Sequence, residues 1–77
     1  MQIEIITPEE KLFSGEGSSV TVPGTDGELG ILNNHAPLIT SLKEGAIRLQ
    51  TNEGDKTFDV KGGVVEVMNN KVVILAE

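Results

Sequence analysis

The sequence predicts an all-β domain, built as a sandwich or a barrel. Three observations indicate this class: apolar residues alternate with polar ones in most runs, turn-forming residues separate the runs, and no stretch of ten residues has the 3.6-residue period of an amphipathic helix. Many short strands at this spacing are typical of sandwiches and barrels. The chain has 77 residues and no linker-like segment, so residues 1–77 are expected to form one domain.

Six runs are expected to be strands, and β-branched residues are common in them. They are Gln2–Thr7, Ser19–Val22, Ala46–Gln50, Thr57–Lys61, Val64–Met68 and Lys71–Ala76. Most of these runs alternate, which predicts one inward and one outward face. The last is apolar almost throughout, as expected of a strand buried on both faces. Asn69-Asn70 precedes it and predicts a two-residue hairpin turn, because asparagine tolerates positive φ angles.

The middle third of the chain has a different character. Glycine recurs at every third position within Pro23–Gly30, which is too rich in glycine for a simple strand and predicts a shaped loop. The next segment, Ile31–Thr40, is expected to form short strands joined by tight loops. Within it Pro37 holds Ala36 in an extended conformation.

The charge and composition exclude several classes of function. A formal net charge of -6 argues against binding nucleic acid and against docking on anionic lipid heads. No apolar run approaches the roughly 20 residues that cross a bilayer, and the alternating N-terminus is not a signal peptide. We therefore expect no membrane insertion. The chain has no cysteine, which excludes disulfides and thiolate metal sites and fits a cytosolic location.

The sequence offers no convincing catalytic, cofactor or metal site. The glycine spacing matches neither the dinucleotide fingerprint nor a P-loop. His35 is the only histidine, and its neighbours Asn33, Asn34 and Glu28 do not make a catalytic or metal-binding set. We expect the His35 ring to bond to backbone in a loop, where it remains free to contact a partner. The chain is predicted not to be an enzyme and to need no cofactor or metal.

The carboxylates on the predicted strands, Glu4, Asp59 and Glu66, fall on outward positions and are interpreted as surface charges. Asp26 and Glu28 differ because they lie two residues apart in the glycine-rich segment. There they could meet a polar partner or bind a cation weakly, although nothing matches the twelve-residue calcium loop.

Lys56 supports an alternative hypothesis. Carrier domains of about this size present a lipoyl or biotinyl lysine at a hairpin tip, and Gly54-Asp55-Lys56 fits the minimal pattern of such a tip. An ordinary solvated turn explains the same residues and is the favoured interpretation. A generic β-sandwich binding module is a third possibility that the residues alone leave open.

Several motifs in order along the chain resemble one family. The central one, V-P-G-T-D-G-E-L-G-I-L-N-N-H-A-P-L-I-T, covers Val22–Thr40. The others are Leu12–Gly15, Gly45–Leu49, Gly62–Val67 and Asn70–Ala76. Together they closely resemble the epsilon subunit of bacterial F-type ATP synthases, with family-like spacing over essentially the whole chain.

The resemblance implies a sandwich of two packed, mostly antiparallel sheets with about ten short strands; the C-terminal helical hairpin of most family members is not expected in these residues. It also implies a non-catalytic central-stalk subunit, part of the rotor, which links the gamma subunit to the membrane c-ring. Such a subunit couples proton or sodium translocation to ATP synthesis. Its location would be peripheral, on the cytoplasmic face of the inner (plasma) membrane.

The resemblance also implies roles for particular positions and an exposed apolar patch near His35 to Thr40. The c-ring contacts carried over by position are Glu28, Leu29 and Gly30. The gamma-subunit contacts carried over by position are Thr7, His35 and Thr40.

One departure from the family concerns the C-terminus. Most members continue beyond the position of Ala76 into two helices that inhibit ATP hydrolysis in many bacteria and bind ATP in some. This chain stops at Glu77. From these residues we expect neither helix-mediated inhibition nor an ATP site.

Overall fold

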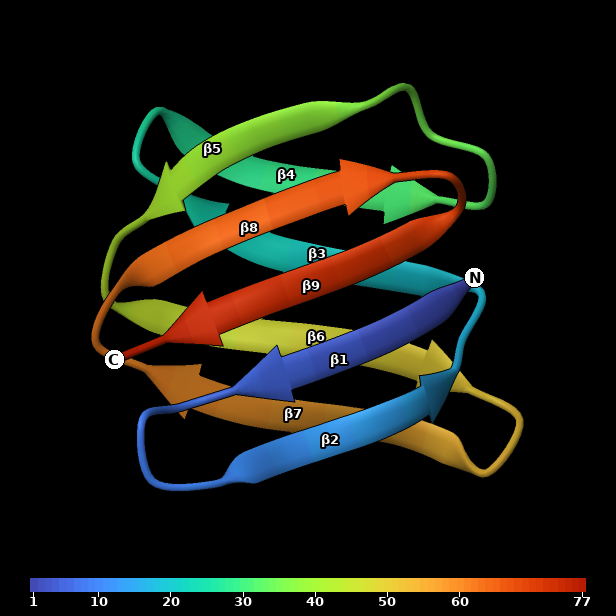
Figure 1. Ribbon diagram of the computed structural model, residues 1–77, viewed down its shortest axis with the longest axis horizontal. Coiled ribbons are helices and arrows are strands. Elements are labelled where there is room, and N and C mark those ends of the chain that lie inside the picture. Colours follow the sequence, from blue (N-terminus) through green and yellow to red (C-terminus); the bar gives the residue numbers. More distant parts are fainter.

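The computed structural model describes all residues, 1–77, and contains nine strands and no helix (Figure 1). The all-β prediction is confirmed, with nine strands against the expected ten or so. The strands are β1 (Gln2–Ile6), β2 (Lys11–Glu16), β3 (Ser19–Gly24), β4 (Gly27–Leu32), β5 (Leu38–Leu42), β6 (Gly45–Thr51), β7 (Gly54–Val60), β8 (Gly63–Met68) and β9 (Lys71–Ala76).

The strands form two layers that face each other (Figure 1). One layer has the order β2-β1-β9-β8-β5, and we call it the five-stranded layer. The other has the order β4-β3-β6-β7, and we call it the four-stranded layer. A single residue pair, Gly24 with Leu42, joins the two ladders. All pairings are antiparallel except that of β1 with β9. This arrangement confirms the predicted sandwich.

Aliphatic side chains from both layers fill the space between them. The 15 buried core residues are Met1, Ile3, Ile5, Val20, Val22, Ile31, Leu42, Ile47, Leu49, Val60, Val65, Val67, Val72, Ile74 and Ala76. No polar or charged residue is buried. The period-two pattern produces this core because alternate side chains of a strand point to opposite faces.

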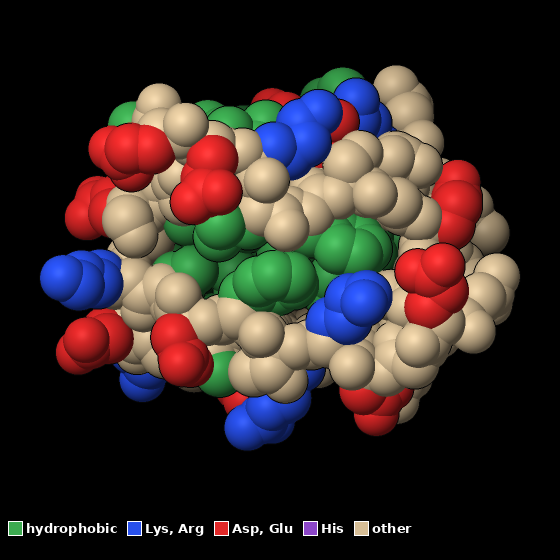
Figure 2. Space-filling view, turned by 90° about the horizontal axis from the view of Figure 1, so that it is seen from below, with side chains coloured by type: hydrophobic (Ala, Val, Ile, Leu, Met, Phe, Trp, Pro, Cys, Tyr) green, Lys and Arg blue, Asp and Glu red, His purple; other side chains and the backbone are tan.

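The core reaches the surface at the edge formed by β2 and β7. Seen from below in Figure 2, apolar side chains lie in the opening between the two layers, with charged residues around them. Phe13 and Phe58, the chain's two phenylalanines, are half-buried and pack against the core. Their ring centroids are 6.1 Å apart, and the rings are tilted by 55°. This tilted geometry is favourable for an aromatic pair.

The predicted turn between β8 and β9 is confirmed. Asn69 and Asn70 have φ angles of 53° and 58°, and the flanking residues Met68 and Lys71 pair directly. Two successive residues with positive φ are the requirement of a tight hairpin whose twist matches that of its strands.

The prediction of a shaped loop over Pro23–Gly30 is wrong. The segment is a hairpin in which β3 pairs with β4, and only Thr25-Asp26 form the turn. Glycine serves close approach at the tip: a Cβ at Gly24 would lie 2.7 Å from the carbonyl oxygen of Gly27, which itself has a φ of 132°. The glycines therefore mark the start and end of a tight turn between two regular strands.

The prediction that Lys71–Ala76 is buried on both faces is also wrong. In β9, Val72, Ile74 and Ala76 are buried, but Leu75 is 55% exposed. Only one face of each layer is covered in a two-layer sandwich, so the second apolar face of β9 is left at the surface.

The strand β2 was not among the six runs identified from periodicity. Its residues, K-L-F-S-G-E, do not alternate cleanly. The structure gives the reason: the register between β1 and β2 shifts at Ile5/Ile6, where Leu12 is the extra residue of a bulge.

Candidate interaction surfaces

The outer surface of the five-stranded layer carries a group of apolar side chains beside charged ones such as Glu4, Glu66 and Lys71. The apolar side chains come from four neighbouring strands, β1, β9, β8 and β5. Ile6, Leu75 and Val64 lie opposite one another across β1, β9 and β8, and Ile39 on β5 lies in the adjacent row. We call this surface the apolar face; its members are Ile6, Ile39, Val64, Met68, Val73 and Leu75. Ile39 is 69% exposed, Leu75 55%, Met68 49% and Val64 40%. Exposed apolar residues gathered on one sheet are typical of a surface that another protein covers.

The outer surface of the four-stranded layer is polar by contrast. A shallow depression there is lined mainly by Ser19, Thr21, Arg48, Gln50, Asp55 and Thr57. Beside it Arg48 and Glu28 form an ion pair at 3.7 Å. Both side chains of this pair are more than 60% exposed, so it contributes little to stability. Of the two sheet surfaces, only the apolar face is suited to being buried against a partner.

Thr7 lies at one margin of the apolar face. Together with Ile6, Val64 and Leu75 it lines a shallow hollow of about 410 Å³. Its hydroxyl oxygen lies 3.1 Å from both the backbone nitrogen and the carbonyl oxygen of Glu10, which fixes the turn between β1 and β2. The side chain is thus held rigidly beside the hollow.

His35 lies in the loop between β4 and β5, at the opposite end of the sandwich from the β1–β2 turn (Figure 1). Its ring Nδ1 is 2.8 Å from the carbonyl oxygen of Ala36, to which an Nδ1–H donates. Its backbone N–H donates to the carbonyl of Leu32 at 3.2 Å. The prediction that the ring bonds to backbone in a loop is confirmed.

Thr40 lies within β5, opposite the buried Val65. The pairing turns Thr40 toward the inner side of this edge strand, where it is half-buried. Its neighbour Ile39 points outward instead. The three positions assigned to gamma therefore do not form one cluster: Thr7 and His35 flank the apolar face at its two ends, and Thr40 lies behind its edge.

The residues assigned to the c-ring lie on β4, next to the hairpin tip but not in it. Glu28 and Gly30 are exposed on the outer surface of the four-stranded layer. Leu29 pairs with Val22 and packs against the core. The structure thus leaves Glu28 and Gly30 accessible and gives Leu29 a supporting place beneath them.

The predicted hairpin-tip position of Lys56 is wrong. The tip between β6 and β7 is Asn52-Glu53, and Lys56 lies inside β7 opposite Leu49. The pairing directs the half-buried lysine toward the inner side of an edge strand. Inward charges of this kind hinder an edge strand from pairing with another chain.

The structure shows no cluster of three or more histidine or acidic side chains that could hold a metal ion. It has no buried side-chain nitrogen or oxygen without a hydrogen-bond partner. No helix with the length and apolar character needed to cross a bilayer is present.

The members of the apolar face on β8 and β9 were missed by the sequence reasoning. A signal existed in the adjacent apolar pairs Val64-Val65 and Ile74-Leu75, which place apolar side chains on both faces of a strand. The apolar run that contains the second pair predicts burial on both sides. In the structure one member of each pair is in the core and the other is at the surface.

Nine strands in two layers and no helix place the chain in the class of small β-sandwich domains. Comparison with known families makes this specific. Residues 1–77 match the model of the ATP synthase delta/epsilon chain β-sandwich domain. The chain therefore belongs to this family, and the resemblance found in the sequence is confirmed.

Two curated relatives are ATP synthase epsilon chains. The protein from Pelotomaculum thermopropionicum is 56% identical over 77 residues, and the one from Desulforamulus reducens is 50% identical over 78 residues. The matches cover 97% and 99% of this chain but 56% and 58% of the relatives. The chain thus spans little more than half the length of these proteins.

Two solved structures share the fold. A chain of the Tetrahymena thermophila mitochondrial ATP synthase central stalk and c-ring superposes with a TM-score of 0.85 at 22% identity, covering 99% of this chain and 62% of that one. A chain of the Euglena gracilis mitochondrial ATP synthase OSCP/F1/c-ring structure gives 0.88 at 21% identity, covering 96% and 48%.

Proposed function

We propose that this chain is a non-catalytic part of the central stalk of a rotary ATP synthase, which joins the gamma subunit to the membrane c-ring. The observation that carries the proposal is the apolar face on a domain of this family. A rotor joint requires a rigid body with surfaces for stable contact, and it requires no reactive group. In this role the domain takes part in coupling proton or sodium movement to ATP synthesis.

The gamma subunit is proposed to cover the apolar face, with Thr7 and His35 at its two ends and Thr40 behind its edge. The molecule measures 26 × 24 Å along its two longer axes. A standard interface buries roughly 800 Å² per partner, so a contact of that size would occupy essentially the whole outline of this face. In such a contact the affinity comes from burying apolar surface. The polar outer surface of the four-stranded layer is better solvated and would gain less from being buried.

The c-ring is proposed to meet the end of the β3–β4 hairpin at Glu28 and Gly30, with Leu29 holding the strand against the core. An exposed carboxylate there fixes register and makes the contact sensitive to salt, and it adds little affinity. The domain would then lie peripherally, on the cytoplasmic face of the membrane.

The described residues are proposed to act as a joint only. We expect that the 77-residue chain does not inhibit ATP hydrolysis when it is added to the catalytic complex. A dose-dependent fall in hydrolysis rate would contradict this part of the proposal.

Co-purification with the gamma subunit from the same genome tests the proposal. We expect stoichiometric binding by the wild-type chain. Ile39→Lys should abolish it, and His35→Glu should weaken it. No binding by a folded wild-type chain would refute the proposed function.

The carrier hypothesis receives no support from the position of Lys56 within β7. Co-expression with a lipoyl or biotinyl ligase should leave the intact mass of the chain unchanged. A mass increase at Lys56 would favour the carrier function instead.

A further inference from the structure

Glu66 lies in the middle of the apolar face. On β8 it stands between Val64 and Met68, and across the sheet its direct partners are Ile39 on β5 and Val73 on β9. All four neighbours are apolar members of the face. No cationic group forms an ion pair with Glu66 within the chain, since the four ion pairs involve Glu4, Glu16 and Glu28 only.

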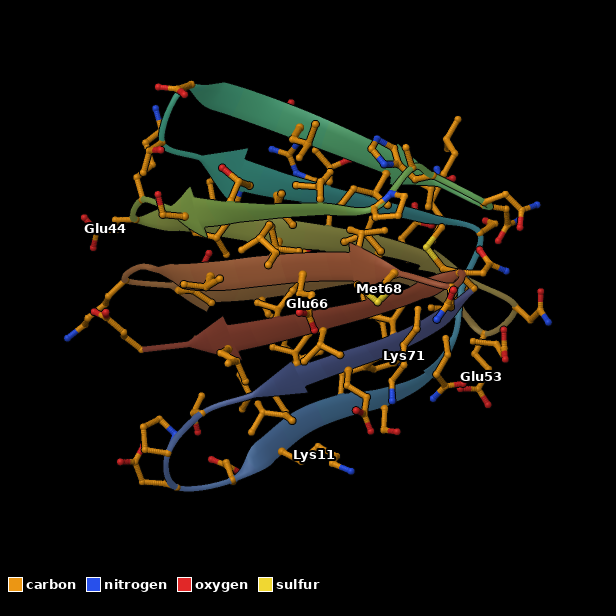
Figure 3. All side chains as sticks on the ribbon, turned by 45° about the horizontal axis from the view of Figure 1, so that its top comes forward. Lys11, Glu44, Glu53, Glu66, Met68 and Lys71 are labelled. Carbon is orange, nitrogen blue, oxygen red and sulfur yellow. The ribbon has the colours of Figure 1, made fainter.

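The cations on the same side of the sheet are already engaged elsewhere. Lys71 on β9 lies 3.7 Å from one carboxylate oxygen of Glu4, and Lys11 on β2 lies 3.4 Å from the other. Figure 3 shows Glu66 and Met68 near one another, with Lys71 and Lys11 at increasing distance toward the opposite edge of the layer. Within the free chain, Glu66 therefore has no ion-pair partner, and the cation nearest to it in the sheet, Lys71, lines the same shallow hollow while paired with Glu4.

Covering the apolar face removes the water that hydrates Glu66. A partner that buries Ile39, Val64 and their neighbours must also cover Glu66, because they flank it along β8 and across the sheet. A carboxylate that loses its hydration without gaining a partner carries a large desolvation penalty. Docking on this face is therefore most favourable when the arriving surface supplies the compensating charge.

We propose that the protein covering the apolar face carries an arginine that pairs with Glu66 in the complex. This inference rests on the proposed docking of the gamma subunit. Arginine suits the position because its guanidinium is more weakly hydrated than an ammonium and holds a carboxylate through two parallel hydrogen bonds. A partner surface that is apolar and carries one well-placed arginine matches this face in both apolar character and sign of charge.

The pair sets orientation and selectivity. Contacts among aliphatic side chains are non-directional, so an apolar sheet surface alone permits several sliding registers. One buried charge pair at its centre restricts docking to the register that satisfies it, and it rejects apolar surfaces that lack the cation. Glu66 is therefore a specificity-determining residue of the joint.

The test compares Glu66→Gln with the matched control Glu53→Gln by titration against the purified gamma subunit. Glu53 is exposed in the β6–β7 turn, away from the apolar face (Figure 3). Both variants lose one negative charge, and both should remain folded because neither side chain is buried. We expect Glu66→Gln to raise Kd at least about tenfold, since breaking one partner of a buried charge pair leaves the other unpaired. Glu53→Gln should change Kd less than about twofold.

The Lys71→Met variant tests whether the cation that pairs with Glu66 in the complex is Lys71 of this chain or a residue of the partner. If Lys71 swung onto Glu66 during docking, Lys71→Met would weaken binding as much as Glu66→Gln and would overturn the proposal. An unchanged Kd for Lys71→Met supports it. The arginine itself is found by combining Glu66→Arg with Arg→Glu variants of gamma, where one combination should restore binding.

The outcomes distinguish this inference from the proposed function. Loss of binding with Ile39→Lys but an unchanged Kd with Glu66→Gln would overturn the arginine pair and leave gamma docking intact. An unchanged Kd with both variants would place gamma on another surface and refute the inference. A wild-type chain that does not bind gamma would overturn both.

Discussion

Replacing Ile39 with alanine removes three carbon atoms from the most exposed large apolar side chain of the molecule. Each buried carbon contributes about 0.8 kcal/mol. Because Ile39 is 69% exposed in the free chain, about two-thirds of that transfer remains to be gained on docking. The predicted loss is about 1.7 kcal/mol of binding free energy, or roughly a 15- to 20-fold rise in Kd for gamma. Isothermal titration at 25 °C measures it, and a urea denaturation curve should show an almost unchanged free energy of unfolding.

Leu32→Ala is the matched control for this prediction. Leu32 is 64% exposed and loses the same three carbons, but it lies on β4 in the four-stranded layer. Its substitution should leave the affinity for gamma almost unchanged. If Leu32→Ala weakened binding as much as Ile39→Ala, or if Ile39→Ala had no effect, the assignment of the apolar face as the docking surface would be refuted.

Three further predictions concern stability. Ile74→Ala, at a fully buried core position, should lower the free energy of unfolding by about 2–5 kcal/mol. For a chain of 77 residues this is a large part of a total of about 4–12 kcal/mol, so urea denaturation should detect it easily. Both Asn70→Val and Asn70→Gly lose the hydrogen bond from the Asn34 backbone N–H to Asn70 Oδ1, but Asn70→Val should cost about 1–2 kcal/mol more because Asn70 has a φ of 58°; equal melting temperatures for the two variants would contradict this. The α-ammonium of Met1 donates to the Gly17 carbonyl at 2.9 Å and to Asn33 Oδ1 at 2.7 Å. Adding Gly-Ser before Met1 should therefore lower stability by about 1–3 kcal/mol, while the same dipeptide added after Glu77 should leave the thermal melting curve unchanged.

Local sequence was sufficient to predict the regular strands and one turn. In β6 the apolar residues Ile47 and Leu49 alternate with Arg48 and Gln50, and this fixes which side faces the core. The pair Asn69-Asn70 predicted its turn because few residues other than glycine and asparagine tolerate two successive positive φ angles. These features depend on interactions within a few residues, which a sequence displays directly.

Features that depend on the other strand were harder to predict. The Pro23–Gly30 segment contains the same glycines whether it forms a loop or a hairpin, and only the pairing of Leu29 with Val22 and of Gly30 with Thr21 distinguishes the two. In the same way, nothing local tells whether Leu75 lies beneath another layer or at the surface. The positions of Thr40 and Lys56 on the inner side of edge strands follow from registers with β8 and β6 that no single strand specifies.

The single ladder contact between the two layers has a mechanical consequence. Under the proposed function, torque enters through the outer surface of the five-stranded layer and leaves through Glu28 on the four-stranded layer. Strand pairing between the layers is limited to Gly24–Leu42 and the two backbone hydrogen bonds that flank it, so the load crosses mainly as shear through the packed aliphatic side chains and the chain crossovers. A close-packed interior has low compressibility and transmits strain. The core of this domain, besides holding the fold together, would then be the stiff element of a torsional coupling.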